Sequence, residues 1–491
     1  MKSLRLPAIL ASVVALSCAT APPAAPPPTA APTTVAAVPP PPAFPATPAV
    51  GSGLTVPVDY YKLPNGLKVV LSPDTTAPTA VVAVYYNIGF RIEPRERTGF
   101  AHLFEHMMFQ GSQNLGKMEF IKLVQANGGV LNGSTRFDHT NYFQIVPSHT
   151  LETILWAEAD RMRGLAITQD NLTNQQGVVK NEVRVNVLNQ PYGGFPWLDL
   201  PQHANTNWYN AHNFYGDLKD LDAATLDDVK KFFTTYYAPN NAALVVVGDF
   251  DAAQTKAWID KYFANLPATP RPAAPDIAEP RQEKEKRASK PDALATRPAL
   301  AIGYHTPAQN TPEYYAMGLL SQILLQGKDS RLYQALVQRN GLTGDVSGGI
   351  NEDLGNMFNI NGPTLFTLSL FHDQDKSADT ILKVIDEEIE RVRREPVDAA
   401  TLDLARVKMR SYLYDQIEGF FGFGRADLLA SFALFQDDPS LINRLEQQFS
   451  TVTPDLVLKT AQEYLRPTNR TILTVEPKAP AKPTTGSPSG S

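Results

Sequence analysis

Two histidines and a glutamate stand close together near the start of the globular part of the chain, where residues 102–106 read His-Leu-Phe-Glu-His. On a helix, positions i, i+3 and i+4 share one face, so His102 and His106 can hold one metal ion while Glu105 points to the same side. Two imidazoles and a carboxylate, with the fourth position left to water, suit catalytic zinc. Zinc would activate that water, and Glu105 would take its proton and pass it to a leaving amine. The alternative is a pair of buried histidines that bond to backbone carbonyls.

Residue types alone do not select the third metal ligand. A cysteine zinc site is excluded from the folded part, because the one cysteine of the chain is Cys18. The same half of the chain offers several acidic candidates, which are Glu119, Glu152, Glu158, Asp160 and Glu182. The remaining histidines lack ligand spacing and are expected at the surface or in the core; they are His139, His149, His203, His212, His305 and His372.

The elements that must position these residues form a mixed pattern of helices and strands. Helical periodicity runs over residues 100–109, 151–163 and 172–188, and strand-like apolar runs cover residues 67–71 and 81–86. The two kinds of element do not alternate strictly, as they would in a doubly wound parallel sheet. We therefore expect an α+β fold in which a mainly antiparallel sheet is packed with helices.

An internal repeat indicates that this α+β unit occurs twice. Eight residues of one helix-turn-strand segment recur 228 positions later: Thr225, Asp227, Val229, Lys231, Tyr236, Pro239, Asn241 and Val247 match Thr453, Asp455, Val457, Lys459, Tyr464, Pro467, Asn469 and Val475. Chance similarity is the alternative, but the shared proline and asparagine of the turn favour duplication. The sequence predicts two domains, residues 55–266 with the metal motif and residues 297–476 without it, joined by a charged, proline-rich linker over residues 267–296.

Composition excludes several functional classes. The chain has 491 residues, of which 43% are hydrophobic and 19% charged, and this is typical of a globular protein large enough for two or more domains. Its formal net charge is -6, and it has no long run of basic residues. A nucleic-acid partner is therefore not expected.

The two ends of the chain are typical of export and tether segments. Residues 1–18 predict a bacterial lipoprotein signal peptide, in which basic residues and a short apolar run precede Cys18 as the lipidated residue. The alternative is an ordinary signal peptide that is cut elsewhere and discards Cys18. Residues 19–54 hold 12 of the 41 prolines and predict a tether, and residues 477–491 predict a disordered tail. Because Ala19 is not acidic, we expect an outer-membrane lipoprotein that faces the periplasm and meets the membrane only through its lipid.

The surroundings of the metal motif resemble a known enzyme family. Residues 98–109 read Thr-Gly-Phe-Ala-His-Leu-Phe-Glu-His-Met-Met-Phe and are similar to the active-site helix of insulinase/pitrilysin zinc metallopeptidases, in the short branch that includes the mitochondrial processing peptidases. The similarity continues through residues 131–135, 236–241, 247–250 and 330–333. It implies a zinc-dependent endopeptidase that hydrolyses peptides or unfolded polypeptides inside a chamber closed by two duplicated halves.

The resemblance also implies roles for residues that spacing leaves open. In this family a glutamate on a later helix completes the zinc site, and Glu182 matches it with 75 residues lying between His106 and Glu182. Asn132 and Gly133 would lie on an edge strand that receives the substrate as an added strand. The alternative for these two is an ordinary hairpin, since Asn-Gly is a common turn pair.

The chain departs from the family pattern close to the predicted zinc site. Seven residues before the ligand glutamate the family usually places a second glutamate, and this chain has Gln175. A neutral amide supplies no charge at that position. We expect a working but weaker zinc site, because changes of this kind typically cost ~10–100-fold in metal affinity or activity.

The second half lacks two side chains that, in active relatives, hold the substrate and its developing oxyanion. An arginine and, seven residues later, a tyrosine are expected around Gly341 and Leu342, where this chain has Val337 and Gly344. Neither side chain can donate a hydrogen bond. We therefore predict the metal-bearing subunit of a heterodimer, whose homologous partner supplies the arginine and the tyrosine. The rival hypothesis is a non-catalytic assembly or peptide-binding subunit of the same fold.

Overall fold

The structure is a computed structural model that describes residues 54–477. The predicted signal peptide, the lipidation site Cys18, the tether up to residue 53 and the tail after residue 477 lie outside the described residues. The described helices and strands belong to one compact unit that begins at Val56. None of the helices between residues 54 and 477 combines the length and the apolar content that crossing a membrane requires.

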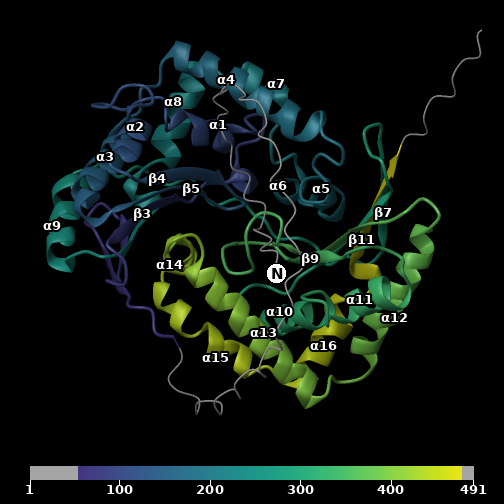
Figure 1. The fold of residues 1–491 in the computed structure, drawn as a ribbon. Helices are drawn as coiled ribbons and strands as arrows, with labels where there is room; N and C mark the ends of the chain where they lie inside the picture. The colour runs from purple at the N-terminus through teal and green to yellow at the C-terminus, as the bar shows by residue number, and fades with distance from the viewer. Residues whose placement is uncertain (1–53, 478–491) are drawn as a thin grey trace, which may run out of the picture. The chain divides into compact units, whose positions relative to one another are not determined.

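The first half of the chain builds a six-stranded sheet with the strand order β1-β2-β6-β3-β5-β4. Its strands β3, β4 and β5 are labelled in Figure 1. Its strands are β1 (Asp59–Lys62), β2 (Lys68–Pro73), β3 (Thr79–Tyr86), β4 (Val130–Thr135), β5 (Thr140–Pro147) and β6 (Ala242–Gly248). The pair β2 and β6 is parallel, and the other pairs are antiparallel. β4 is an edge strand that pairs with β5 and has no second neighbour among the described strands.

Both faces of this sheet are buried, as the central strand β3 shows. Alternate residues of a strand point to opposite faces. One set of β3 residues packs with the helices of the first half, and the other set joins a core shared with the second half; these sets are Ala80, Val82, Val84 and Tyr86, and Val81, Ala83 and Tyr85. Burial on both faces explains why β3 reads as a continuous apolar run instead of an alternating one.

Nine α-helices between residues 54 and 263, the part of the first half that the structure describes, accompany the sheet. They are α1 (Phe100–Met107), α2 (Glu119–Ala126), α3 (Leu151–Arg163), α4 (Gln169–Val183), α5 (Asp199–Ala204), α6 (Trp208–Ala211), α7 (Leu218–Ala223), α8 (Leu226–Tyr236) and α9 (Ala252–Phe263). The predicted helices over 100–109 and 151–163 correspond to α1 and α3. The predicted helix over 172–188 corresponds to α4 followed by a π-helical turn, Arg184–Leu188.

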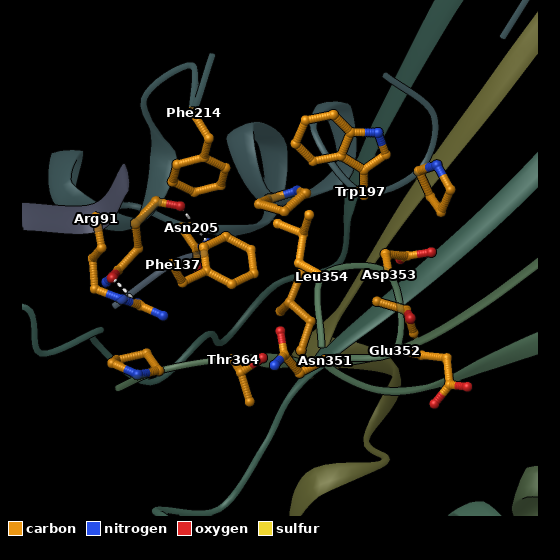
Figure 2. A pocket seen from close by; sticks show the side chains of 16 residues that line it. Arg91, Phe137, Trp197, Asn205, Phe214, Asn351, Glu352, Asp353, Leu354 and Thr364 are labelled. Carbon is orange, nitrogen blue, oxygen red and sulfur yellow. Dashed lines mark hydrogen bonds between the residues drawn. The ribbon is translucent and has the colours of Figure 1, made fainter. Parts of the chain in front are cut away.

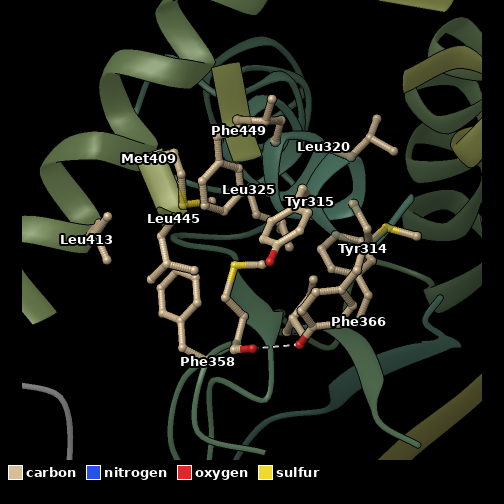
Figure 3. Packing of buried hydrophobic residues seen from close by; sticks show 14 of the residues in the cluster. Tyr314, Tyr315, Leu320, Leu325, Phe358, Phe366, Met409, Leu413, Leu445 and Phe449 are labelled. Atoms are coloured by element: carbon tan, nitrogen blue, oxygen red, sulfur yellow. Dashed lines mark hydrogen bonds between the residues drawn. The ribbon is translucent and has the colours of Figure 1, made fainter. Parts of the chain in front are cut away.

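The second half repeats this plan with a five-stranded sheet in the order β7-β11-β8-β10-β9. Its strands are β7 (Lys286–Asp292), β8 (Ala299–His305), β9 (Ser347–Ile350), β10 (Leu365–Phe371) and β11 (Arg470–Pro477). Its helices are α10 (Pro312–Leu324), α11 (Arg331–Tyr333), α12 (Ala378–Arg394), α13 (Ala399–Glu418), α14 (Phe423–Gln436), α15 (Leu445–Ser450) and α16 (Pro454–Tyr464). Figure 3 shows its core, where the Tyr314 hydroxyl donates to the Met357 carbonyl at 2.7 Å.

The predicted duplicated α+β fold is confirmed. If β1 is set aside, the two sheets have the same strand order, and each has one parallel pair at the same place, β2 with β6 and β7 with β11. The repeated asparagines play the same part in both halves. Asn241 Nδ2 donates to the carbonyls of Asn87 and Tyr236, and Asn469 Nδ2 donates to those of His305 and Tyr464. The turn asparagine is thus kept in both copies because its side-chain amide satisfies two backbone carbonyls, one at the end of the preceding helix and one at or directly after the end of a neighbouring strand.

The predicted linker over residues 267–296 contains a strand that the sequence analysis did not expect. β7 occupies residues 286–292 of this range and pairs in parallel with β11. Its charged residues misled the interpretation of the pattern, because β7 is an edge strand and edge strands tolerate charge. The second sheet therefore begins by residue 286.

Helix α14 joins the two halves. It belongs to the second half by sequence but packs against β2, β3 and β6 of the first sheet, on the face opposite α1 (Figure 1). Arg425 forms an ion pair with Asp74 at 2.8 Å, and the Tyr85 hydroxyl donates to Asp427 at 2.7 Å. The two halves consequently share one continuous hydrophobic core.

Candidate metal centre

Helices α1 and α4 pack together and bring three predicted metal ligands to one point. The Nε2 atoms of His102 and His106 are 3.3 Å apart. Oε1 of Glu182 lies 3.5 Å from His102 Nε2, and Oε2 lies 3.2 Å from His106 Nε2. Among the described residues, this trio is the one group of histidines, cysteines and carboxylates whose ligand atoms could hold a metal ion. The other six histidines lie outside it, in agreement with the sequence analysis.

The separation of the two imidazole nitrogens fits a tetrahedral zinc ion. Bonds of ~2.0–2.1 Å at a tetrahedral angle would hold two nitrogen ligands ~3.3 Å apart, which is the distance between His102 Nε2 and His106 Nε2. The Glu182 carboxylate faces both nitrogens, each through a different oxygen. The donor set also fits, because two neutral imidazoles and a carboxylate leave one coordination position open, as catalytic zinc requires.

The charges around the three ligands favour a cation. Burial alone lowers the pKa of His102, but the carboxylates of Glu182 and Glu105 outweigh it, and the net shift raises the pKa. Burial alone raises the pKa of Glu182, yet its contacts with the two imidazoles outweigh this, and the net shift lowers the pKa. Glu182 is thus held ionised, as a metal ligand must be.

Glu105 lies on the same helix as the two histidines, but its carboxylate is not part of the converging trio. Its Oε2 accepts a hydrogen bond of 2.7 Å from the Thr135 hydroxyl on β4. This contact fixes one carboxylate oxygen and leaves Oε1 for another partner. Sequence reasoning did not identify Thr135, because no local pattern links a strand residue to a helix residue 30 positions earlier.

Asn132 and Gly133 lie within β4, at the free edge of the sheet. They are not the turn residues of a hairpin, since β4 continues to Thr135 before the chain reverses into β5. Gly133 packs beside the motif of residues 102–106, because a Cβ built there would lie 3.3 Å from Glu105 Cγ. The edge strand and Glu105 therefore border the same space.

Gln175 is buried on α4, two turns before Glu182. Its side-chain amide donates to Asn174 Oδ1 at 2.8 Å. The bond to Asn174 links the amide to its own helix. Within the part of the chain that the structure describes, Gln175 makes no hydrogen bond with His102 or His106, so it does not support either imidazole directly.

Two further residues support the centre and were missed by sequence reasoning. The ring of Tyr215 lies 5.2 Å from the ring of His102, and burial, followed by the charges of Glu182 and Glu105, raises the pKa of its hydroxyl. Glu93 is fully buried and caps α1, because its two oxygens accept N–H bonds from Gly99 and Ala101 at 2.8 and 2.6 Å. Tyr215 is distant from the motif in sequence, and Glu93 reaches α1 from a preceding loop instead of from a helical position, so spacing carries no signal for either.

A cavity lies next to this aromatic support. Trp197 contacts the ring of Tyr215 at 5.3 Å and also lines the cavity. Both halves of the chain contribute to its walls (Figure 2): Phe137, Trp197 and Phe214 come from the first half, and Asn351 and Leu354 from the second. Tyr215, which supports the candidate metal centre, therefore lies next to a cavity between the two halves. This cavity forms only when both halves are folded.

Family models match both halves of this duplicated structure. The model described as insulinase (peptidase family M16) matches residues 68–192, which hold all four residues of the metal motif, and the model described as peptidase M16 inactive domain matches residues 223–409. The chain belongs to the insulinase (M16) family of peptidases. The resemblance drawn from residues 98–109 is confirmed.

Relatives of this M16 chain are named zinc proteases. Zinc protease PqqE of Helicobacter pylori is 28% identical over 423 residues, which cover 84% of this chain and 92% of that protein. The crystal structure of a protease from Helicobacter pylori has a TM-score of 0.79 at 27% identity and covers 86% of this chain and 100% of that one. The periplasmic protease PqqL from Escherichia coli has the same fold, with a TM-score of 0.70 at 18% identity over 87% of this chain and 48% of that one.

The two departures in the second half of this M16 chain lie in and after a π-helical turn, Gln334–Arg339. Val337 is half-buried in the turn, and Gly344 is exposed in the loop that follows it. A Cβ built at Gly344 would meet no atom within 4 Å. Packing therefore does not require glycine there, and a larger side chain would have room.

Proposed function

We propose that this chain is a zinc-dependent endopeptidase subunit whose metal is bound by His102, His106 and Glu182. The observation that carries the proposal is the convergence of these side chains at separations of 3.2 to 3.5 Å, with Glu105 beside them. Relatives named zinc proteases support the same chemistry. Zinc bound here would polarise the scissile carbonyl and lower the pKa of a coordinated water.

Other residues of the chain bind the peptide and transfer the proton. β4 binds the peptide by pairing with its backbone, so that Asn132 and Gly133 contact the substrate strand. Glu105 acts as general base and later returns the proton to the leaving amine. The Thr135 hydroxyl holds Oε2 of Glu105 and so directs Oε1 toward the reacting water.

We further propose that a homologous chain completes the active site. Val337 and Gly344 supply no hydrogen-bond donor for the oxyanion, and removal of one such donor typically costs ~10²–10³-fold in kcat. A partner that carries the arginine and the tyrosine would restore this contribution. The partner would also close the chamber that encloses the peptide.

Export to the periplasm is part of the proposal. The predicted signal peptide and Cys18 support attachment to the outer membrane through lipid. The neighbour from Escherichia coli is named a periplasmic protease, which agrees with this location. Peptides or unfolded polypeptides in the periplasm are then the expected substrate class.

A second candidate function is peptide binding without turnover. It is favoured by Gln175, Val337 and Gly344, which all remove groups that active relatives use. The intact trio of His102, His106 and Glu182 argues against it, because a binding subunit has no need of a complete metal centre.

Cleavage of a quenched peptide tests the proposal directly. The chain is assayed alone and with a homologous chain that lacks the metal motif but carries the arginine and the tyrosine, each with and without a zinc chelator. We expect chelator-sensitive cleavage in the mixture and a loss of about 10³-fold or more when Glu105→Gln is used, with zinc content unchanged. Equal cleavage by Glu105→Gln would reject the assigned base. Normal cleavage by the chain alone would reject the shared active site.

A further inference from the structure

A glycine-rich loop between α13 and α14 exposes two aromatic side chains. Residues 419–424 read Gly-Phe-Phe-Gly-Phe-Gly. Phe421 is 79% exposed and Phe420 is 44% exposed. Large apolar side chains are costly to leave in water when a fold can bury them, so adjacent exposed phenylalanines indicate a surface for binding.

The backbone of this loop is strained and yet well braced. Phe420 and Phe421 have φ values of 48° and 56°, in the left-handed region that non-glycine residues rarely adopt. Gly424 N donates to Gly419 O at 2.9 Å, and Phe423 N donates to Phe420 O at 3.1 Å. Strain of this kind persists only where the surrounding structure enforces it, and it concentrates at functional sites.

The loop is docked on the sheet of the first half. The ring of Phe423 stacks on that of Phe143 with centroids 3.8 Å apart, and Phe420 meets the same ring edge-on at 5.9 Å. A Cβ built at Gly422 would lie 3.7 Å from Val81 on β3. The two exposed side chains are thus held at a fixed place on the sheet.

The loop contacts β5, which is the neighbour of β4, the strand proposed to pair with the substrate. Phe143 on β5 is directly opposite Asn132 on β4, so these two side chains share one face of the sheet. Gly133 lies on the other face, next to Glu105. A peptide paired with the free edge of β4 would therefore alternate its side chains between the Glu105 face and the face of the loop.

We propose that Phe420 and Phe421 form the wall of a specificity subsite for a large apolar side chain of the substrate. The subsite takes the side chain that points to the Asn132 face of the added strand. This inference rests on the proposed function, since it assumes that a peptide pairs with β4. The expected substrates are therefore peptide segments that carry a leucine or a phenylalanine at the position that contacts the loop.

Peptide binding, rather than cleavage, tests the subsite. The full-length chain with Glu105→Gln is titrated with a short fluorescein-labelled alanine-serine peptide that carries one central guest residue, either phenylalanine or alanine. We expect the phenylalanine peptide to bind about tenfold more tightly, and Phe421→Ala to reduce this preference to about twofold or less. Leu404→Ala, which removes a 51% exposed side chain from α13, is the matched control and should keep the preference.

The outcomes separate the subsite from the peptidase function. An unchanged preference in Phe421→Ala, or no binding of either peptide, overturns the subsite. A loss of preference in Phe421→Ala supports it, even if the cleavage assay finds no turnover and so rejects the peptidase function. A change in oligomeric mass for Phe421→Ala with the same peptide preference overturns it as well, because the loop would then bind another protein chain. Phe421→Leu, which keeps apolar bulk, should retain most of the preference.

Discussion

The orientation of the Glu105 carboxylate depends on Thr135, which has no such role for the candidate metal ligands. The Thr135 hydroxyl donates to Glu105 Oε2 at 2.7 Å, and hydrogen bonds to a charged group contribute roughly 1.5–3 kcal/mol. We predict that Thr135→Val lowers kcat about 10–100-fold and leaves KM within about twofold, because the base loses its orientation while peptide pairing with β4 remains. Zinc content should stay at the wild-type level.

Peptide cleavage by the chain with its partner, under saturating and limiting substrate, measures this split. Ser134→Ala is the control, since Ser134 is the preceding residue of β4 and bonds to Asn141 instead of Glu105. A rise in KM with kcat unchanged would show that Thr135 acts on substrate binding and would refute the positioning role.

Gln175 provides a second test at the level of one side chain. We predict that Gln175→Glu tightens zinc binding by about tenfold or more, because a buried carboxylate two turns before Glu182 adds negative charge on the side of α4 that carries this ligand. Competition with a chelator of known affinity measures the change. Gln169→Glu introduces the same charge at the exposed start of α4 and should have little effect. Unchanged affinity in Gln175→Glu would show that this position does not tune the metal.

Sequence reasoning located the metal centre only in part. The spacing of His102, Glu105 and His106 is a local helical pattern, so it is visible in one short stretch. Glu182 lies on another helix and could be chosen from five acidic residues only through the family resemblance. Thr135 and Tyr215 could not be found at all, because their contacts with Glu105 and His102 arise from the packing of distant segments.

At the scale of elements, α1 begins without an ordinary N-terminal cap. Its N-cap residue is Gly99, whose φ is 83° and which has no side chain, and Glu93 accepts the free N–H groups instead. Burial raises the pKa of Glu93 to about 8, although its two N–H bonds lower the pKa and the nearby charge of Asp220 raises it further. The helix that carries both candidate metal-ligand histidines is therefore anchored by a titratable group.

This anchor predicts how stability changes with pH. Between the ordinary pKa of 4.5 and the folded pKa of about 8, the folded chain keeps a proton on Glu93 that the unfolded chain releases. Stability from this group is complete below the lower value and is lost as pH rises toward the upper one. Glu93→Gln cannot ionise, so the difference in free energy of unfolding, wild type minus variant, should fall across this range.

Denaturant titrations at several pH values measure this difference. Glu387→Gln, on the exposed face of α12, is the control and should show no such trend. A difference between wild type and Glu93→Gln that stays constant with pH would mean that Glu93 is already ionised in the folded state.

The helices and strands also show which features the sequence pattern could not predict. Helical periodicity predicts α1 and α3, and the structure confirms both helices, although burial extends around most of each one. The sequence pattern predicts a linker where the edge strand β7 lies, because its charged residues and its proline resemble a solvated segment. The placement of α14 on the first sheet could not be predicted either, since an apolar helix does not reveal which sheet will cover it.

For the whole molecule, the shared core has a consequence for unfolding. Val81 and Val245 of the first sheet pack in the same hydrophobic cluster as Leu428 and Leu429 of α14. Separate domains of this size would be expected to unfold in separate steps. Because neither half can expose its side of this core without exposing the other, we predict a single thermal transition whose calorimetric and van't Hoff enthalpies agree.

Tyr85→Phe probes the same coupling. It removes the hydroxyl that donates to Asp427 at 2.7 Å across the junction, and loss of such a buried bond to a carboxylate costs roughly 1.5–3 kcal/mol. We expect the one transition to move to lower temperature without splitting, because the apolar part of the junction remains intact. Tyr209→Phe, whose ring keeps its contact with Arg95, is the control and should leave the transition unchanged. Two resolved transitions in the wild type would show that the halves fold independently, and the metal centre of the first half would then not require the second half for its stability.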